Sequence, residues 1–109
     1  MKIICKIWVN AKNEDNAIKL LERLEEKLGK KLFEINVEPY TKINGFVISS
    51  TLFAETNNWN DSVVETIALA QKIGNWCSIN GRINEEFLIG SNKTNISGIE
   101  SFDLMISKQ

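Results

Sequence analysis

A strand-helix unit occurs twice in this chain of 109 residues and constrains its fold more than any other feature. In the first copy, residues 2–9 alternate in polarity and lead into a helical pattern that ends at Gly29. In the second copy, residues 45–54 lead into a helical pattern that ends at Gly74. Each glycine is followed at once by another strand pattern that carries an aromatic residue. Because strands and helices alternate, we expect helices packed on a sheet.

The first strand pattern has the period of two that marks a strand with one covered face. The set expected to face the core is Ile3, Cys5, Ile7 and Val9. Asn13 or Asp15 offers a side-chain oxygen to cap the helix that follows. Apolar residues in this helix recur at the three- and four-residue spacing of a buried face, namely Ala17, Leu20, Leu21, Leu24 and Leu28. Gly29 supplies the left-handed residue that ends the helix.

The next strand pattern places Phe33, Ile35 and Val37 in one set, which we expect to face the core. Pro39 is expected to end this strand because proline has no backbone donor. After an Asn-Gly turn signal, residues 46–54 alternate with moderately apolar side chains on both sides. This is typical of a hairpin partner near the centre of a sheet.

The second helix is expected to begin near Ser62, which has the capping-box spacing with Glu65. Gly74 ends it, and Trp76 at the start of the next strand is predicted to lie in the core. Further strands are predicted over residues 76–79, 87–89 and 102–106, the first two joined by an Asn-Gly turn.

This order of elements predicts an α+β fold, a ferredoxin-like βαββαβ two-layer sandwich with an antiparallel sheet and extra C-terminal strands. Residues 1–109 have the size of a single domain. Right-handed crossovers place both helices on one face of the sheet. The opposite face lacks a cover, so its mixed side chains are either solvated or receive a partner. The expected outward residues are Ile4, Lys6, Trp8, Glu34 and Asn36.

The formal net charge of -1 provides no global positive field for nucleic acid. Residues 1–51 carry nine Lys and Arg against seven Asp and Glu, whereas residues 52–109 carry four against seven, so the second half is acidic. No stretch approaches the roughly 18 apolar residues of a membrane helix. The first residues also lack the pattern of a secretory signal. We therefore expect a cytoplasmic protein that binds neither a membrane nor nucleic acid directly.

The absence of histidine removes the commonest general base and the commonest zinc ligand. Cys5 and Cys77 lie in predicted strands, and buried, reduced thiols are favoured over a disulfide between them. The glycines match no phosphate-loop or dinucleotide spacing. Glu85 and Glu86 are neighbours that point to opposite faces of an extended chain, so they do not form a catalytic pair. We expect a protein that is not an enzyme and that uses no metal or cofactor.

The second half of the chain carries a distinctive spacing of glycine and tryptophan. It comprises Trp59-Asn60-Asp61-Ser62-Val63, Ile73-Gly74-Asn75-Trp76-Cys77-Ser78-Ile79-Asn80-Gly81, Ile89-Gly90 and Ile99. This pattern resembles the C-terminal part of small bacterial immunity proteins, which neutralise polymorphic toxins, including those of contact-dependent growth inhibition. The resemblance implies a small, cofactor-free cytoplasmic domain that binds a cognate toxin domain, such as a nuclease. It also implies that acidic side chains face the toxin, since charge complementarity selects the partner and speeds association.

On this hypothesis the acidic second half binds the toxin, with Asp61, Glu65, Glu85 and Glu86 as charges and Trp59 as the anchor. Trp59 is equally consistent with a hydrophobic staple over the first apolar residues of the second helix. The alternative function is a small-molecule-sensing or regulatory module that dimerises through its sheet. For the oligomeric state, a monomer is favoured.

Overall fold

The structure, a computed structural model, describes residues 1–82 and 85–108. Within these residues the chain forms two α-helices, one short 3-10 helix and eight strands. In chain order they are β1 (Lys2–Val9), α1 (Glu14–Leu28), β2 (Phe33–Tyr40), η1 (Thr41–Ile43), β3 (Gly45–Phe53), α2 (Trp59–Ile73), β4 (Gly74–Asn75), β5 (Ser78–Asn80), β6 (Glu86–Ser91), β7 (Lys93–Thr94) and β8 (Ile99–Ser107). Neither described α-helix is both long and apolar enough to cross a membrane.

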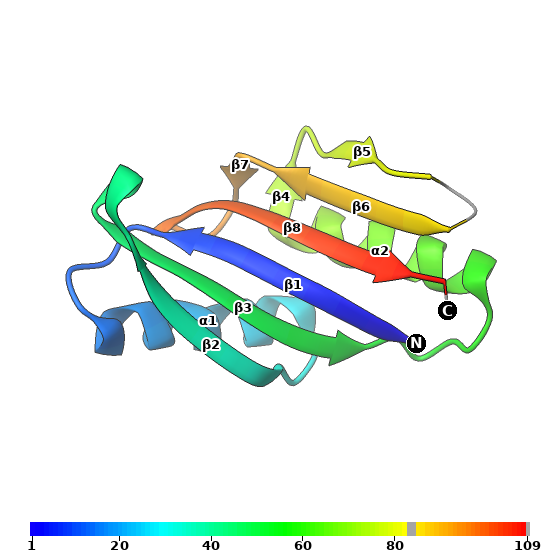
Figure 1. The fold of residues 1–109 in the computed structure, drawn as a ribbon, viewed down its shortest axis with the longest axis horizontal. Helices are drawn as coiled ribbons and strands as arrows, with labels where there is room; N and C mark the ends of the chain where they lie inside the picture. The colour runs from blue at the N-terminus through cyan, green and yellow to red at the C-terminus, as the bar shows by residue number, and fades with distance from the viewer. Residues whose placement is uncertain (83–84, 109) are drawn as a thin grey trace.

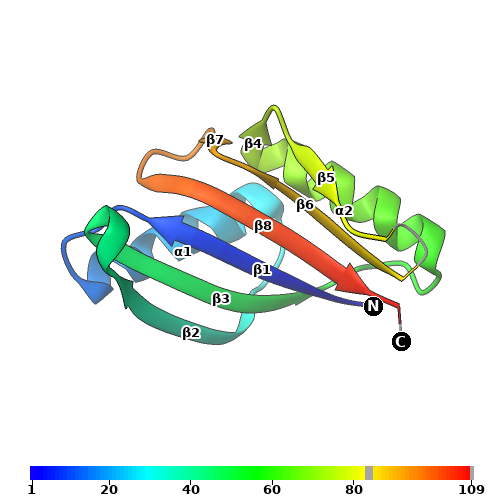
Figure 2. The same ribbon diagram turned by 45° about the horizontal axis from the view of Figure 1, so that its top comes forward.

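Six of the described strands form an antiparallel sheet in the order β2-β3-β1-β8-β6-β5. β4 and β7 pair separately as a short ribbon. Both helices lie behind the sheet in Figure 1, and Figure 2 shows the same arrangement after a turn. The predicted α+β class, with two helices and an antiparallel sheet, is therefore confirmed.

The order of the strands does not confirm a ferredoxin-like topology. The β2-β3-β1 half agrees with it, because β3 lies between two strands that are joined through α1. The other neighbour of β1 is β8, the last strand of the chain, rather than the first strand after α2. The chain passes through α2 from β3 to β5 at the far edge, and it then returns inward through β6 to β8.

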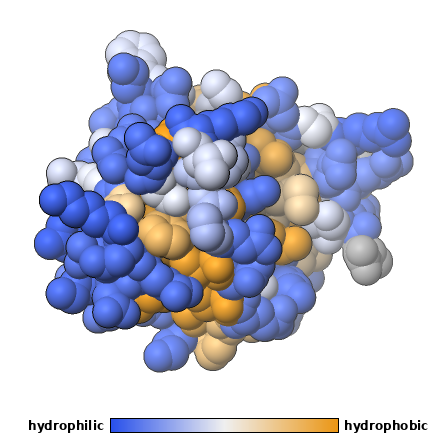
Figure 3. All heavy atoms as spheres, turned by 60° about the vertical axis from the view of Figure 1, so that its left-hand side comes forward, coloured by the Kyte–Doolittle hydropathy of each residue, from blue (hydrophilic) through white to orange (hydrophobic). Residues whose placement is uncertain are grey.

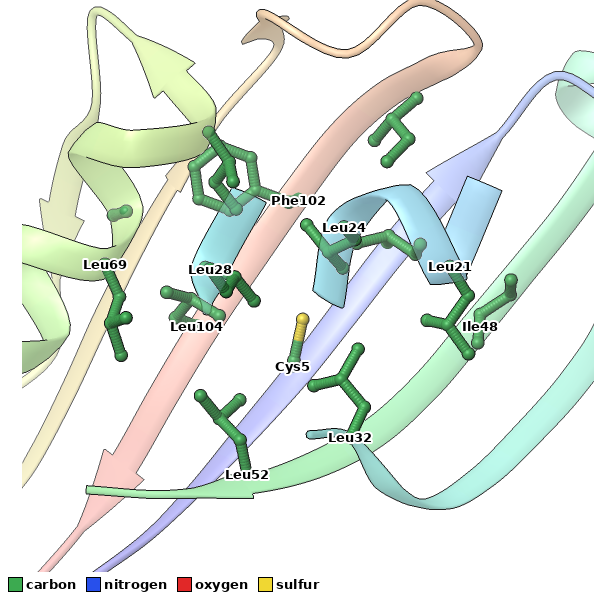
Figure 4. Close-up of a cluster of buried hydrophobic side chains, with 14 of the residues drawn as sticks. Cys5, Leu21, Leu24, Leu28, Leu32, Ile48, Leu52, Leu69, Phe102 and Leu104 are labelled. Carbon is green, nitrogen blue, oxygen red and sulfur yellow. The ribbon is translucent and has the colours of Figure 1, made fainter. Parts of the chain in front are cut away.

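The first strand-helix unit forms as its local pattern predicts. All four predicted inward residues of β1 and all five residues predicted for the buried face of α1 are buried. Asn13 caps α1, because its Oδ1 accepts a hydrogen bond from the backbone N of Asn16 at 2.9 Å. Gly29 ends the helix with φ 68°, in the left-handed region. Figure 4 shows Cys5 of β1 among leucines of α1 and β3, so this unit forms the centre of the core.

The predicted inward set of β2 is wrong for Phe33 and Ile35, which are both 45% exposed. β2 lies at the edge of the sheet, and its register with β3 shifts by one residue between Phe33 and Asn36. Glu34 has φ 52° at this bulge. A bulge resets the alternation of side chains, so Phe33 and Val37, which are an even number of residues apart, do not share a face. Pro39 does not end β2 as expected but lies within it, which an edge strand tolerates.

The predicted capping box of α2 is also wrong. Asn58 caps the helix instead, because its Oδ1 accepts from the backbone N of Asp61 at 2.9 Å. Asparagine caps a helix as well as serine does, and α2 therefore begins three residues before Ser62, at Trp59. Ser62 is buried inside the helix and donates its hydroxyl to the carbonyl of Thr56 at 3.2 Å.

The segment after α2 differs from the predicted strand. Gly74 ends the helix, but it is extended, with φ -150°. A side chain at this position would clash with the ring of Phe102. The prediction that Trp76 lies in the core is wrong. Its side chain is 87% exposed, and its backbone has φ 56°. Cys77 precedes β5 and is partly buried, and it is a free thiol like Cys5, as the preference for reduced cysteines predicted.

Candidate functional site

The structure brings four of the five predicted partner-binding residues to one end of the molecule. Trp59 and Asp61 lie in the first turn of α2, and Glu85 and Glu86 lie where the chain enters β6. The first turn of α2 and the start of β6 are at the same end in both Figure 1 and Figure 2. Trp59 is partly buried against the hydrophobic core, whereas the three acids are exposed.

Glu65, the fifth predicted residue, is bound within the chain. Its carboxylate accepts hydrogen bonds from the backbone N of Glu55, at 2.8 and 2.9 Å, and of Thr56, at 3.2 Å. It also accepts from the hydroxyl of Thr56 and lies 3.4 Å from the ammonium of Lys30. Burial would raise the pKa of Glu65, but these hydrogen bonds lower it overall. Only 17% of its side chain is exposed, so Glu65 holds the loop before α2 in place.

The sheet face opposite the helices, called the open face here, is covered by no described helix (Figure 1). Ile4, Lys6 and Trp8 of β1 point outward on this face, as predicted, because they alternate with buried residues. β8 contributes Asp103 and Met105, which pair with Lys6 and Ile4 in register. The open face is therefore a mixed surface at the centre of the sheet.

The open face is hollowed into a groove of about 380 Å³ on the side where Trp8 and Trp76 lie. Trp8 comes from β1, whereas Trp76 comes from the turn before β5. Between them lie residues of β5, β6 and β8 and of the turn after β6. The described residues that line the groove, besides the two tryptophans, are Ser78, Asn80, Leu88, Gly90, Ser91, Asn92, Ser101, Phe102 and Asp103. Two indoles thus flank a largely polar floor.

The backbone at Trp76 is held by the ribbon of β4 and β7. Asn75 pairs with Lys93 in this ribbon, and its carbonyl accepts a hydrogen bond from the hydroxyl of Ser91. The same hydroxyl accepts from the backbone N of Lys93 at 2.9 Å. A left-handed conformation costs a residue with a side chain about 1–2 kcal/mol, which the surrounding contacts must offset. The structure therefore maintains Trp76 in an exposed position at the groove.

Asp103 lies in the floor of the groove and is half-buried. Its neighbours in register are Lys6 on β1 and Gly90 on β6. A side chain at residue 90 would clash with the Asp103 carboxylate, so the missing side chain of Gly90 leaves room for it. Burial raises the pKa of Asp103, and the positive charge of Lys6 partly opposes this shift.

The ammonium of Lys6 lies 5.4 Å from the centroid of the Trp8 ring, within the range of a cation-π contact. It forms no ion pair within 4.0 Å of Asp103, although the two residues are cross-strand neighbours. Among the described residues, the carboxylate of Asp103 has neither a hydrogen bond nor an ion pair. The groove thus contains a half-buried acid without a close partner.

A larger groove, of about 510 Å³, lies between α1 and residues 95–97. Arg23, Glu26 and Lys27 line it, and an adjoining groove adds Lys12 and Lys19. The end of the molecule where α1 begins is largely hydrophilic around a band of hydrophobic surface (Figure 3). No aromatic residue lines either groove among the described residues. These charged side chains are exposed, as is typical of the solvent-facing side of an amphipathic helix.

The Trp8–Trp76 groove offers polar groups to a ligand. Its described lining supplies one carboxylate, with hydroxyls and amides, and contains no cysteine. In the described part of the chain, no group of three or more His, Cys, Asp or Glu residues is placed to hold a metal ion. Comparisons with models of protein families, with curated proteins and with solved structures found no match to this chain.

Sequence reasoning missed Trp76 and Asp103 as site residues. The pattern of buried Phe102, Leu104 and Ile106 already places Asp103 on the outward side of β8 by alternation. Its neighbours were not predictable, because they depend on β8 pairing between β1 and β6. Nothing in the sequence around Trp76 indicates its left-handed backbone.

Proposed function

We propose that this protein is a binding module that recognises a protein partner through the open face. The observation that carries this proposal is the exposed and conformationally strained position of Trp76. Strained backbone persists where the surrounding structure enforces it, and it gathers at functional sites. Tryptophan is also enriched among the residues that dominate binding energy at protein interfaces.

We further propose that the partner is a toxin domain, which this protein neutralises as a cytoplasmic immunity protein without enzymatic activity or direct binding to nucleic acid. This step is supported by the resemblance of residues 59–99 to the C-terminal part of small bacterial immunity proteins. That segment includes Trp76 and most of the residues that line the groove. In this proposal Asp61, Glu85 and Glu86 steer the partner as a secondary charged surface. The fold would be an elaborated ferredoxin-like sandwich, for which the β2-β3-β1 half of the sheet is the support.

The test is co-expression with the toxin domain encoded next to this protein. We expect wild-type protein to restore growth and to co-purify with the toxin. Trp76→Ala should weaken the complex at least about 30-fold, corresponding to about 2 kcal/mol for a central interface residue. Val64→Ala is the matched control, because Val64 is an exposed apolar residue on α2, away from the open face.

Each outcome has a distinct meaning. Failure to restore growth with wild-type protein would reject toxin neutralisation. Restored growth with an unchanged affinity for Trp76→Ala would reject the open face as the binding surface.

A second candidate is the regulatory module that dimerises through its sheet. Phe33 and Phe53 favour it, because their rings pack 5.9 Å apart between centroids and are both exposed. Exposed Ile4 lies on the adjacent strand, and together these residues form an apolar area on which a second copy could pack. Light scattering tests this function directly: a monomer at high concentration rejects it, whereas a dimer that Phe53→Ser dissociates supports it.

A further inference from the structure

The unpartnered carboxylate of Asp103 indicates what the groove binds. A half-buried acid loses part of its hydration, and a hydrogen-bond donor from a ligand can replace the part that is lost. Within the described residues no such donor reaches Asp103, and Lys6 is held at Trp8 instead. A ligand that brings donors to the floor of the groove would therefore gain a charge-assisted hydrogen bond.

The two indoles indicate which kind of ligand group donates to Asp103. Trp8 already has the ammonium of Lys6 near its ring. Trp76 has no ring or cation contact among the described residues, and most of its surface is free. A flat cation satisfies both features, because it lies against an aromatic face and donates hydrogen bonds from its edge.

Among the side chains of a protein partner, arginine has this combination. The guanidinium is planar, weakly hydrated and carries five donors in a fixed geometry that matches a carboxylate. Lysine brings a compact and strongly hydrated ammonium, and Lys6 already supplies one. The carbonyl and hydroxyl oxygens of Asn80 and Ser101 offer acceptors for donors that Asp103 does not use.

We propose that the groove receives an arginine side chain of the protein partner, with the guanidinium against the indole of Trp76 and hydrogen-bonded to Asp103. This inference rests on the proposed function, because it assumes a protein partner. The groove of about 380 Å³ has room for the side chain and part of the adjoining backbone.

The experiment uses the isolated protein and the probe N-acetyl-arginine amide. The indole N–H resonances of the three tryptophans are followed by NMR during the titration. Trp59 is an internal control, since it lies at the opposite end of α2 from Trp76, separated by roughly 20 Å of helix. We expect the Trp76 and Trp8 resonances to shift and saturate at millimolar probe, while Trp59 stays unchanged.

Substitutions in the groove, a control substitution and two further probes test whether binding depends on Asp103 and on the guanidinium. Asp103→Asn should weaken binding of the arginine amide at least fivefold, and Trp76→Ala should do the same if Asp103→Asn does not fold. Glu100→Gln, which removes an exposed acid from the same strand, is the matched control and should leave affinity unchanged. N-acetyl-lysine amide should bind at least fivefold more weakly than the arginine amide. Cellobiose tests for a carbohydrate ligand.

The inference is overturned if the arginine amide shifts neither groove tryptophan, if lysine or cellobiose binds as well, or if Asp103→Asn has no effect. These failures are separable from failure of the proposed function. Restored growth without arginine binding rejects the arginine pocket alone. Arginine binding without restored growth rejects the toxin as partner and retains the pocket.

Discussion

Replacing Glu65 by alanine distinguishes a structural role from the partner-binding role predicted by the sequence. The carboxylate joins α2 to the preceding loop and to Lys30, which follows α1. Lys30 is only 14% exposed, and it also donates to the carbonyl of Phe53 at 3.0 Å and to the carboxylate of Glu55 at 2.8 Å. Glu65→Ala removes one of the two carboxylates that contact Lys30. It also leaves the backbone N–H groups of Glu55 and Thr56 without their acceptor.

The size of this effect follows from the contacts. A hydrogen bond to a charged group contributes about 1.5–3 kcal/mol, and removing one partner of a buried ion pair costs about 3–5 kcal/mol. The Glu65 site is partly exposed and Glu55 remains as a partner for Lys30, so we take the lower end, about 3 kcal/mol. At about 4 °C per kcal/mol for a domain of this size, the melting temperature should fall by about 12 °C.

Urea unfolding monitored by circular dichroism measures the change in the free energy of unfolding. Glu85→Ala is the matched control, because Glu85 forms an ion pair with Arg82 at 3.1 Å that is largely exposed on both sides. Exposed pairs contribute about 0–1 kcal/mol, so this variant should be close to wild type. If Glu65→Ala were as stable as Glu85→Ala, the structural assignment of Glu65 would be refuted.

Three further predictions concern pH, packing and thiol reactivity. Because the pKa of Glu65 is lowered in the folded state, its stabilising contribution is present above its ordinary pKa of 4.5 and is lost as the pH falls below that value. Thermal melts between pH 7 and 3 should therefore show a smaller loss of stability at acid pH for Glu65→Gln than for wild type. Gly74→Ala should cost about 1–3 kcal/mol in urea unfolding, since the added methyl group clashes with the buried ring of Phe102; unchanged stability would contradict the close packing. Burial raises the pKa of Cys5 to about 12, so a thiol reagent should label Cys77 first in the native protein, and mass spectrometry that finds Cys5 labelled first would contradict the core assignment.

The parts of the fold that the sequence predicts are those determined by local physics. The alternation in β1 and the spacing of leucines in α1 each specify one buried face, and both faces are formed. The cap at Asn13 and the left-handed Gly29 need only neighbouring backbone groups. Such features do not depend on which strands eventually pair, so a pattern in one segment is sufficient to predict them.

The errors occur where long-range pairing decides the outcome. Phe33 and Ile35 have the alternation of a covered strand, but β2 is at an edge and contains a bulge at Glu34. Trp76 follows a helix end and precedes a strand, which predicts an extended core residue, yet the β4–β7 ribbon turns the chain there. Glu65 has capping-box spacing with Ser62, but the competing cap at Asn58 frees its carboxylate for the loop before α2. In each case a partner distant in sequence, or a competing local group, changes the role of the residue.

The strand order that the sequence could not predict is also what creates the candidate site. In a ferredoxin-like order the first strand after α2 would lie beside β1. The turn at Trp76 would then be next to β1, and no other strand would lie between Trp76 and Trp8. Instead β8 and β6 lie between β1 and β5. Three strand spacings of about 4.8 Å place β5 about 14 Å from β1. The floor of the groove is formed by the two inserted strands, through Asp103 of β8 and Gly90 of β6. The late return of the chain to the sheet centre therefore supplies both the width of the groove and its only carboxylate among the described lining residues.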